Sequence, residues 1–325
     1  MKYKTIFLCN HPEQVNYVYS PDRKARLAEL TDLREGTVTA EELANGGCSD
    51  VEIVFSTWGM PSLSEEELAK YLPNLKAVFY GAGATDAFVR PLLARGVKVL
   101  SAWQANAIPV AEFCVAQILL SLKGYFRNSR EIHRTGDWQS GKPCIGPGVY
   151  GETVALIGAG AISTKVRELL QAFQINVVVV PSRPERRTVS LEEVFQTALV
   201  ISNHLPNRDD NIGVLHRGLF ASMRPGATFI NTGRGAQVDE AGLVEVLESR
   251  PDLTALLDVT WPEPPPAGSK LYTLPNIRLS SHIAGSVNDE VHRMADYMIE
   301  ELKRFLAGEP LRYEVNESML LTSRK

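Results

Sequence analysis

Residues 153–175 read TVALIGAGAISTKVRELLQAFQI, and this stretch decides the fold that the sequence predicts. A short apolar run leads into Gly158-Ala159-Gly160. Apolar residues then recur at helical spacing before a second apolar run at 176–180. This order predicts a strand, a glycine turn, an amphipathic helix and a second strand. Because such a turn presents the backbone N–H groups of a helix N-terminus to a pyrophosphate, we expect a dinucleotide-binding unit.

Each small residue of the glycine turn has its own expected role. Gly158 allows the tight turn, and Gly160 lets the backbone come close to a pyrophosphate. Ser163 stands where this fingerprint usually carries a third glycine, and its side chain is small enough for close packing of helix against strand. Ala161 and Ile162 open the helix, so we expect them among the cofactor contacts.

Strand and helix patterns alternate along almost the whole chain, and this alternation favours an α/β fold with parallel sheets. The run 177–180 is continuously apolar, which predicts a strand that is buried on both faces of its sheet. Long helices are predicted over 106–126 and 289–306 from their apolar spacing. The short apolar runs that predict strands are 6–8, 53–55, 77–80, 97–100, 154–157, 177–180, 199–202, 228–231, 255–259 and 277–279.

Length, charge and cysteine usage limit the kind of protein. The chain has 325 residues, which suits about two domains. Its 34 Lys and Arg against 38 Asp and Glu leave a formal net charge of −4, and no basic block stands out, so we expect no nucleic-acid partner. The 4 cysteines form no Cys-x-x-Cys pair, which predicts free thiols in a reducing compartment. No His, Cys and Asp cluster has metal-ligand spacing, so no metal is expected.

The apolar segments predict neither a leader nor a membrane span. The start, MKYKTIFLCN, lacks the apolar core of a signal peptide. The most apolar stretch, 113–122, contains Gln117 and is too short to cross a bilayer. We therefore expect a cytoplasmic protein that has no membrane partner.

The end of the strand predicted over 177–180 bears on the choice of cofactor. NAD-binding turns usually place Asp or Glu there, to accept a hydrogen bond from the ribose 2′-OH. Here the chain continues Pro181-Ser182-Arg183, and two further arginines follow closely. A carboxylate would repel a 2′-phosphate, whereas Arg binds phosphate through paired hydrogen bonds. The strand end therefore favours NADP(H), with Ser182 and Arg183 as its contacts. NAD(H) bound through backbone groups remains the alternative.

Three later segments each follow a predicted strand, at the edge where open α/β sheets bind ligands. They are NTGRG with Arg234, LDVTWPEP with Asp258 and Glu263, and SSHIAGS with His282. Arg234 could bind a substrate carboxylate and polarise its carbonyl group. His282 is suited to donate a proton near neutral pH, and Glu263 would stabilise the imidazolium. Together these residue types predict a site for the reduction of a keto acid by hydride transfer.

The order of these motifs resembles the D-isomer-specific 2-hydroxyacid dehydrogenases, clearly over about 77–308. The resemblance lies in GAGAIS, NTGRGAQVDEAGL, LDVTWPEP and SHIAGS, which follow one another in this order. It implies that Arg234 binds substrate, that His282 is the acid/base, and that Glu263 pairs with His282. The strand-end Asp that is frequent in the family is absent here. With Arg183 nearby, this absence resembles the NADP-preferring reductases of glyoxylate and hydroxypyruvate.

The resemblance implies further contacts on the cofactor side. Asp258 would contact the nicotinamide carboxamide. The loop that contains His204 and Pro206 would lie beside the cofactor. Thr232, which lies two residues before Arg234, is also expected to contact the cofactor.

On the substrate side, the resemblance implies that the backbone of a turn at Ala82 and Gly83 holds the substrate carboxylate. Asn106 matches a position near the substrate. The pattern G-x-D-N-x-D, common in the family after this glycine, is changed to GATDAF here, which affects the local turn. Trp58 follows a predicted strand end and is expected at the mouth of the substrate site. Related reductases place a tryptophan near the partner subunit's active site, and Trp138 matches it.

The resemblance also implies an architecture of two doubly wound parallel-sheet domains. A Rossmann cofactor domain, 102–288, would be inserted into a flavodoxin-like substrate domain. The substrate domain would consist of 1–101 and of 289–325, whose helix returns to it. In this family, the long helix near 106–126 forms part of a homodimer interface, so we expect a homodimer.

The function that these features predict is that of an oxidoreductase. It would transfer a hydride between NADP(H), or NAD(H), and a small 2-oxo acid to give a D-2-hydroxy acid. The alternative is an NAD(H)-sensing regulator of the same fold, similar to a corepressor, because such relatives can keep the Arg, Glu and His residues. The short tail VNESMLLTSRK offers little for regulatory partners, which favours the enzyme.

Overall fold

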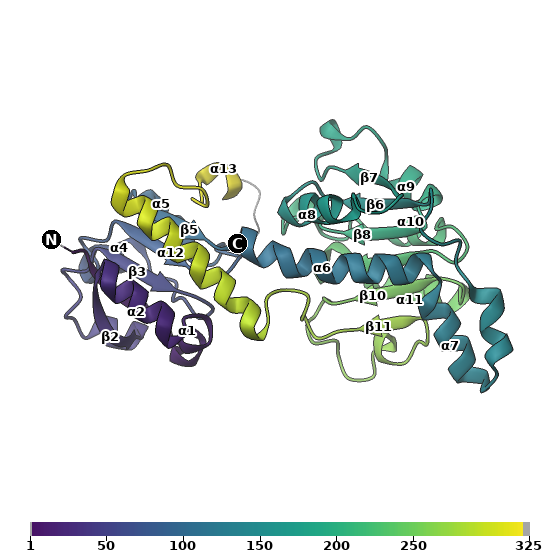
Figure 1. Cartoon of the computed structure of the whole chain (residues 1–325), viewed down its shortest axis with the longest axis horizontal. Coiled ribbons are helices and arrows are strands. Elements are labelled where there is room, and N and C mark those ends of the chain that lie inside the picture. The colour runs from purple at the N-terminus through teal and green to yellow at the C-terminus, as the bar shows by residue number, and fades with distance from the viewer. Residues whose placement is uncertain (1, 321–325) are drawn as a thin grey trace. The chain divides into compact units, whose positions relative to one another are not determined.

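The computed structural model describes residues 2–320, apart from the side chain of residue 318, and it divides into two units (Figure 1). Unit 1 consists of Met1–Asn106 and Ser286–Lys325, and unit 2 of Ala107–Gly285. Each unit contains one parallel sheet, with five strands in unit 1 and six in unit 2. The predicted α/β class with two parallel-sheet domains is therefore confirmed.

The sheet of unit 1 has the strand order β2-β1-β3-β4-β5, and all neighbouring strands are parallel. This is the order of flavodoxin-like sheets. Its strands are β1 (Lys4–Leu8), β2 (Asp32–Val38), β3 (Ile53–Ser56), β4 (Ala77–Tyr80) and β5 (Lys98–Ser101). Its helices are α1 (Pro12–Val18), α2 (Pro21–Leu30), α3 (Ala40–Ala44), α4 (Glu65–Tyr71), α5 (Val89–Ala94), α12 (Val291–Ala307) and α13 (Glu317–Leu320).

Successive residues of the central strands in unit 1 face two different cores. In β1, Phe7 packs in the core that contains α1, α2 and α12, whereas Ile6 and Leu8 pack in the core that contains α3, α4 and α5. In β4, Phe79 joins the first core and Val78 the second. Because side chains alternate along a strand, the sheet is apolar on both faces and helices cover both.

The sheet of unit 2 has the order β11-β10-β9-β8-β6-β7, again with parallel neighbours. The chain starts at β6, moves out to β7 and returns to β8 on the other side, so the direction of winding reverses beside β6. Its strands are β6 (Thr153–Ile157), β7 (Asn176–Val180), β8 (Val200–Asn203), β9 (Thr228–Asn231), β10 (Thr254–Leu257) and β11 (Ile277–Leu279). Its helices are α7 (Tyr125–Thr135), α8 (Ala161–Leu170), α9 (Leu191–Thr197), α10 (Arg217–Ala221) and α11 (Glu240–Ser249), and α6 (Trp103–Leu122) enters it from unit 1.

The structure corrects two expectations about strands. The run 177–180 lies in β7, which is an edge strand of its sheet. Three of the four side chains in this run are only partly buried. An apolar run alone does not distinguish an edge strand from a central one. The strand β2 was not predicted, because its sequence DLREGTV is polar and mostly exposed at the other sheet's edge.

The helix expected over 106–126 is shorter at its C-terminal end. The helix α6 ends at Leu122, and α7 begins at Tyr125. Gly124 between them has φ +72°, and a Cβ there would collide with the carbonyl oxygen of Cys144. This left-handed position therefore separates the two helices.

The helix α6 is 20 residues long, which is long and apolar enough to cross a membrane by length and composition alone. The expectation that the most apolar stretch, 113–122, is too short to cross a bilayer took in only part of this helix. However, half of its most apolar window is buried inside the protein. Its Ala111, Cys114, Ile118 and Leu122 recur at helical spacing and pack into the core of unit 2, as in a core helix.

Replacing Phe229 in β9 tests the core of unit 2. This side chain is only 1% exposed and packs edge-on against Phe220, with ring centroids 5.0 Å apart. We expect Phe229→Ala to lower the free energy of unfolding by about 3–5 kcal/mol, because it leaves a cavity. Urea unfolding would measure the loss. The control Phe173→Ala, at a position that is 38% exposed, should lose far less, and equal losses would contradict this description of the core.

Candidate active site

The glycine turn between β6 and α8 has the backbone that a dinucleotide requires. Gly158 has φ +107°, and a Cβ there would collide with the carbonyl group of His204. Gly160 faces open space, since no atom of residues 2–320 other than its chain neighbours lies within 4 Å of the position of its missing Cβ. Gly160 is also the N-cap residue of α8 and provides no side-chain cap. The first N–H groups of this helix can therefore bind an anion, and Ala161 and Ile162 lie there as expected.

His204 follows β8 and lies against this turn. Its backbone N–H donates to the carbonyl oxygen of Ile157 over 2.7 Å. Its side chain is buried, and neither ring nitrogen has a hydrogen-bond partner among residues 2–320. Burial lowers the pKa of the imidazole to about 4, so His204 is neutral at pH 7. The buried hydroxyl of Ser163 also lacks a partner within the described part of the chain.

These unpartnered groups fit a bound polar ligand, because buried polar atoms in proteins are normally hydrogen-bonded. The open space at Gly160 and the uncapped helix fit a pyrophosphate in particular. The residues of unit 2 thus suit a dinucleotide. By contrast, no group of three or more His, Cys, Asp or Glu side chains within residues 2–320 could hold a metal ion.

The loop after β7 contains Ser182 and Arg183, both partly buried. Arg187 holds this loop, because its guanidinium donates to the carbonyl oxygens of Pro181 at 2.9 Å and of Ser182 at 3.0 Å. The hydroxyl of Ser182 accepts a hydrogen bond of 3.4 Å from Nη1 of Arg208.

Arg208 was not predicted. It follows β8 in the segment NRDDN, where a run of charged residues suggests an exposed loop, yet its side chain is only 6% exposed. The only signal in the sequence is its place after a strand end.

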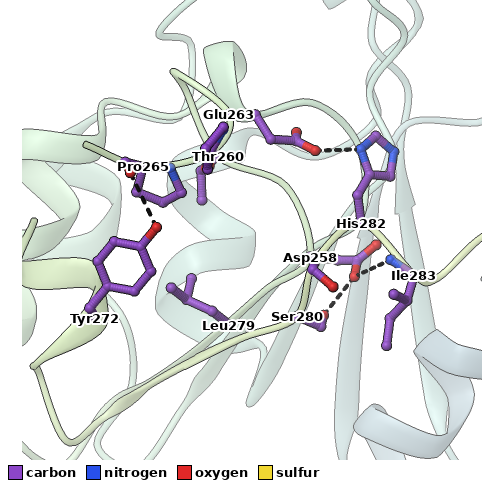
Figure 2. Close-up of a pocket in the computed structure, with 11 residues that line it drawn as sticks. Asp258, Thr260, Glu263, Pro265, Tyr272, Leu279, Ser280, His282 and Ile283 are labelled. Atoms are coloured by element: carbon purple, nitrogen blue, oxygen red, sulfur yellow. Dashed lines mark hydrogen bonds and ion pairs between the residues drawn. The ribbon is translucent and has the colours of Figure 1, made fainter. Parts of the chain in front are cut away.

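His282 and Glu263 form the central pair of the site (Figure 2). Nδ1 of His282 and Oε1 of Glu263 are 2.7 Å apart, and each side chain is about half exposed. The sequence predicted this pair from two segments that lie 19 residues apart. Since Nδ1 faces the carboxylate, the other ring nitrogen, Nε2, is available to a ligand.

Asp258 fixes the loop that contains His282. The Asp258 carboxylate accepts hydrogen bonds from the Ser280 hydroxyl at 2.6 Å and from the backbone N–H of Ile283 at 2.9 Å (Figure 2). It also accepts one from the backbone N–H of Ala284 at 3.0 Å. Its carbonyl oxygen accepts the N–H of His282 at 3.0 Å. Asp258 is nearly buried, so these bonds compensate its charge. The role that the structure shows for Asp258 is to position His282; a contact with nicotinamide stays a prediction.

A cavity of about 680 Å³ opens beside the pair. Asp258, Glu263 and His282 line it, and the apolar parts of Leu279, Tyr272 and the prolines after Glu263 form much of its wall (Figure 2). The phenol of Tyr272 donates to the carbonyl oxygen of Pro265 at 3.1 Å, which fixes one side. The cavity is large enough for a small ligand, and the residue types of the pair are able to exchange a proton with it.

Arg234 lies in the loop after β9, and its side chain is exposed. Nη1 donates to the carbonyl oxygen of Gly233 at 2.8 Å. The buried side chain of Gln237 accepts from the N–H of Arg234 at 3.2 Å and from Asn203 at 2.7 Å. Buried polar side chains therefore fix the backbone of the loop, while the guanidinium of Arg234 is exposed to solvent. Thr232 is buried, and its hydroxyl lies 3.3 Å from the thiol of Cys114.

The predicted substrate residues of unit 1 form a separate group. Trp58 follows β3, and Ala82 and Gly83 follow β4, the neighbouring parallel strand, so they lie at the same sheet edge. The Ser101 hydroxyl donates to both carbonyl oxygens of that turn. Asn106 is close to Gly83, and its amide oxygen accepts the N–H of Ser286 at 2.9 Å. These residues belong to unit 1.

Trp138 begins the 3₁₀ helix η1 (Trp138–Cys144) and is 72% exposed. Pro206, in the loop that follows β8, is also exposed. Its carbonyl oxygen accepts hydrogen bonds from the side chains of Asn211 and Gln237. These bonds fix the course of the loop that follows β8.

The parallel sheet of unit 2, with its glycine turn and neutral buried histidine, defines a dinucleotide-binding α/β protein. Residues 115–284 match the model of the NAD binding domain of D-isomer specific 2-hydroxyacid dehydrogenases. This match covers more than half of the chain, and the chain belongs to this family.

Known relatives are consistent with this membership. The chain is 30% identical to a hydroxypyruvate reductase of Thermotoga maritima over 237 residues, which are 70% of this chain and 77% of that protein. It is 29% identical to a D-3-phosphoglycerate dehydrogenase of Archaeoglobus fulgidus over 262 residues, which are 78% of this chain and 49% of that protein. The chain thus spans about half the length of the D-3-phosphoglycerate dehydrogenase.

Solved structures show the same fold. A phosphoglycerate oxidoreductase from Rhizobium etli superimposes with a TM-score of 0.80 at 22% sequence identity, covering 98% of this chain and 100% of that chain. This likeness confirms the architecture of the chain.

The neutral state of His204 predicts a pH dependence of stability. Because burial lowers the folded-state pKa to about 4, the unfolded state binds the proton first as the pH falls below about 6.5. Stability should therefore be complete above that pH and decrease toward pH 4. Between about pH 7.5 and about pH 5, the wild type should lose about 2 kcal/mol more unfolding free energy than His204→Asn. Urea titrations at both pH values would measure this difference, and equal losses would contradict a buried neutral imidazole.

Proposed function

We propose that the protein is a 2-oxo acid reductase that transfers a hydride between NADP(H), or NAD(H), and a small 2-oxo acid to give a D-2-hydroxy acid. The observation that carries the proposal is the pair of His282 and Glu263, 2.7 Å apart at the wall of a cavity in a chain that belongs to the D-isomer specific 2-hydroxyacid dehydrogenase family. The hydroxypyruvate reductase of T. maritima supports a small substrate of this kind.

His282 would be the acid/base of this reaction. Glu263 would accept a hydrogen bond from Nδ1, which leaves Nε2 available to the ligand. In the direction of reduction, Nε2 of protonated His282 would donate its proton to the carbonyl oxygen of the substrate. The new hydroxyl thus gains its hydrogen from His282, while the carbonyl carbon gains the hydride. In the reverse direction, neutral Nε2 would accept the hydroxyl proton.

The nicotinamide cofactor supplies the hydride when it is bound. Gly158, Gly160, Ala161 and Ile162 would hold its pyrophosphate at the N-terminus of α8. His204 and Pro206, with Thr232, would line the other side, and Asp258 would contact the carboxamide. At the end of β7, Ser182 and Arg183 would bind the 2′-phosphate, which favours NADP(H) over NAD(H).

Arg234 would bind the substrate carboxylate and polarise the carbonyl group. Its guanidinium is exposed on a loop that hydrogen bonds hold in place, so it can approach a ligand without moving the backbone. We propose that Ala82, Gly83 and Asn106 also contact the substrate and that Trp58 lies at the mouth of the site. We further propose a cytoplasmic homodimer with residues 1–101 and 289–325 as the substrate domain and 102–288 as the cofactor domain. No nucleic acid or membrane takes part in the proposed function.

The test is the oxidation of NADPH and NADH with hydroxypyruvate, glyoxylate and bulkier 2-oxo acids. We expect turnover with NADPH and a small acid, because the strand end carries Ser182 and Arg183 in place of a carboxylate. His282→Asn should lower kcat by at least ~100-fold, the usual cost of losing a general acid, without changing dinucleotide affinity. The exposed His133 provides the control His133→Asn, which should keep full activity.

The same assay contains the outcomes that would contradict the proposal. Unchanged kcat in His282→Asn would exclude the assigned acid/base. A preference for NADH would exclude the phosphate contacts and leave the oxidoreductase. Tight binding of a dinucleotide without turnover of any acid would instead favour the NAD(H)-sensing regulator.

Arg234→Ala tests recognition of the substrate. A charge-assisted, paired hydrogen bond to a carboxylate is lost, so KM for the 2-oxo acid should rise by about 10–100-fold. We also expect a lower kcat, because the carbonyl group is less polarised. Steady-state kinetics of this variant and of Arg95→Ala, an exposed arginine of unit 1, would measure both constants. An unchanged KM would show that another group binds the carboxylate.

A further inference from the structure

The geometry points to Arg208 as a second guanidinium for the 2′-phosphate of NADP(H), one that the chain holds in a fixed orientation through Asp210. This inference rests on the proposed function and extends it, since the sequence assigned the 2′-phosphate to Ser182 and Arg183 alone. Arg208 would therefore be a specificity-determining residue in the choice between NADP(H) and NAD(H).

One edge of the Arg208 guanidinium is already occupied. Nε donates to Oδ1 of Asp210 at 2.6 Å, and Nη2 donates to Oδ2 of the same carboxylate. This two-point contact fixes the plane of the guanidinium, because both groups are planar. The remaining nitrogen, Nη1, is then directed at the hydroxyl of Ser182, at 3.4 Å.

The strand order of the sheet places Arg208 and Ser182 on the two sides of the glycine turn. In the order β8-β6-β7, the strands that precede Arg208 and Ser182 lie on either side of β6, the strand that leads into the glycine turn. The contact between Arg208 and Ser182 therefore joins the two loops that flank this turn at the carboxyl edge of the sheet. A dinucleotide bound by its pyrophosphate at α8 extends along this edge.

The charge of Arg208 is buried. Arg208 is 6% exposed, and an arginine that is so deeply buried needs a specific partner. Asp210 compensates this buried charge only in part, because the side chain of Asp210 is itself 58% exposed to water. Nη1 instead meets a hydroxyl, beside Arg183 on the same loop. Two guanidinium groups and a hydroxyl form a donor set that suits a phosphate dianion.

Binding of two adenosine ligands that differ only in the 2′-phosphate tests the inference without any turnover. The probes are 2′,5′-ADP and 5′-AMP, and isothermal calorimetry on the full chain gives Kd for each. We expect Arg208→Gln to raise Kd for 2′,5′-ADP by about 10–100-fold, as for the loss of a charge-assisted hydrogen bond. Kd for 5′-AMP should change by less than about twofold. The variant should fold, because the Asp210 that it leaves behind is largely solvated.

Two further variants distinguish the effect of the fixed orientation of the Arg208 guanidinium from the effect of its positive charge. Arg186 lies on the loop of Ser182 but is exposed, so Arg186→Gln removes the same charge without a directed guanidinium. It should raise Kd for 2′,5′-ADP by less than about threefold, since exposed charges are screened. Arg208→Lys keeps the charge but cannot bind Asp210 at one edge and phosphate at the other. It should lose most of the affinity that Arg208→Gln loses.

Each remaining outcome overturns a particular statement. If the wild type binds 2′,5′-ADP no more tightly than 5′-AMP, the NADP(H) preference of the proposed function is wrong and the inference falls with it. If the wild type prefers 2′,5′-ADP and Arg208→Gln keeps that preference, only the inference is wrong. If Arg208→Gln lowers the affinity for both probes equally, Arg208 only stabilises the loop. If Arg208→Lys binds 2′,5′-ADP as tightly as the wild type, orientation of the guanidinium by Asp210 is not needed.

Discussion

The parallel hydrogen bonding of the sheet in unit 2 is the constraint on which its other features depend. Parallel strands end at one edge, so the segments after β6, β7, β8, β9, β10 and β11 all begin there. The glycine turn, Ser182, His204, Arg234 and Asp258 follow five of these strand ends. Groups that are far apart in the chain thus share one edge, while the apolar strands themselves remain buried in the core.

A second constraint acts within that edge, where the buried carboxylate of Asp258 organises the last loop. Three donors from residues 280–284 converge on its oxygens, and its own carbonyl group binds the N–H of His282. The loop needs this support because His282 has φ +56°, a left-handed conformation that a non-glycine residue seldom adopts. The burial of one charge thereby stabilises a backbone that presents an imidazole to a cavity.

The sequence predicted those parts that depend on local pattern. Apolar runs identified the buried strands, and the glycine turn identified the start of α8, because both follow from residue types within a few positions. The pair of Glu263 and His282 followed from the chemistry of the two segments. The strand β2 and the edge position of β7 were missed, since pairing partners decide both. Arg208 was missed for a related reason: its partners Asp210 and Ser182 define it, and Ser182 lies 26 residues away.

Two histidines of unit 2, His204 and His282, lie in different environments, which suit them to different roles. His204 is enclosed, has no charged partner among the described residues and is neutral, so it suits contact with an uncharged part of a ligand. His282 is half exposed, and its Nδ1 lies 2.7 Å from Oε1 of Glu263, so its other ring nitrogen is accessible to a ligand. A proton donor needs the second environment. Burial and hydrogen-bond partners, more than the presence of histidine, thus decide which of the two side chains is placed to exchange a proton with a ligand.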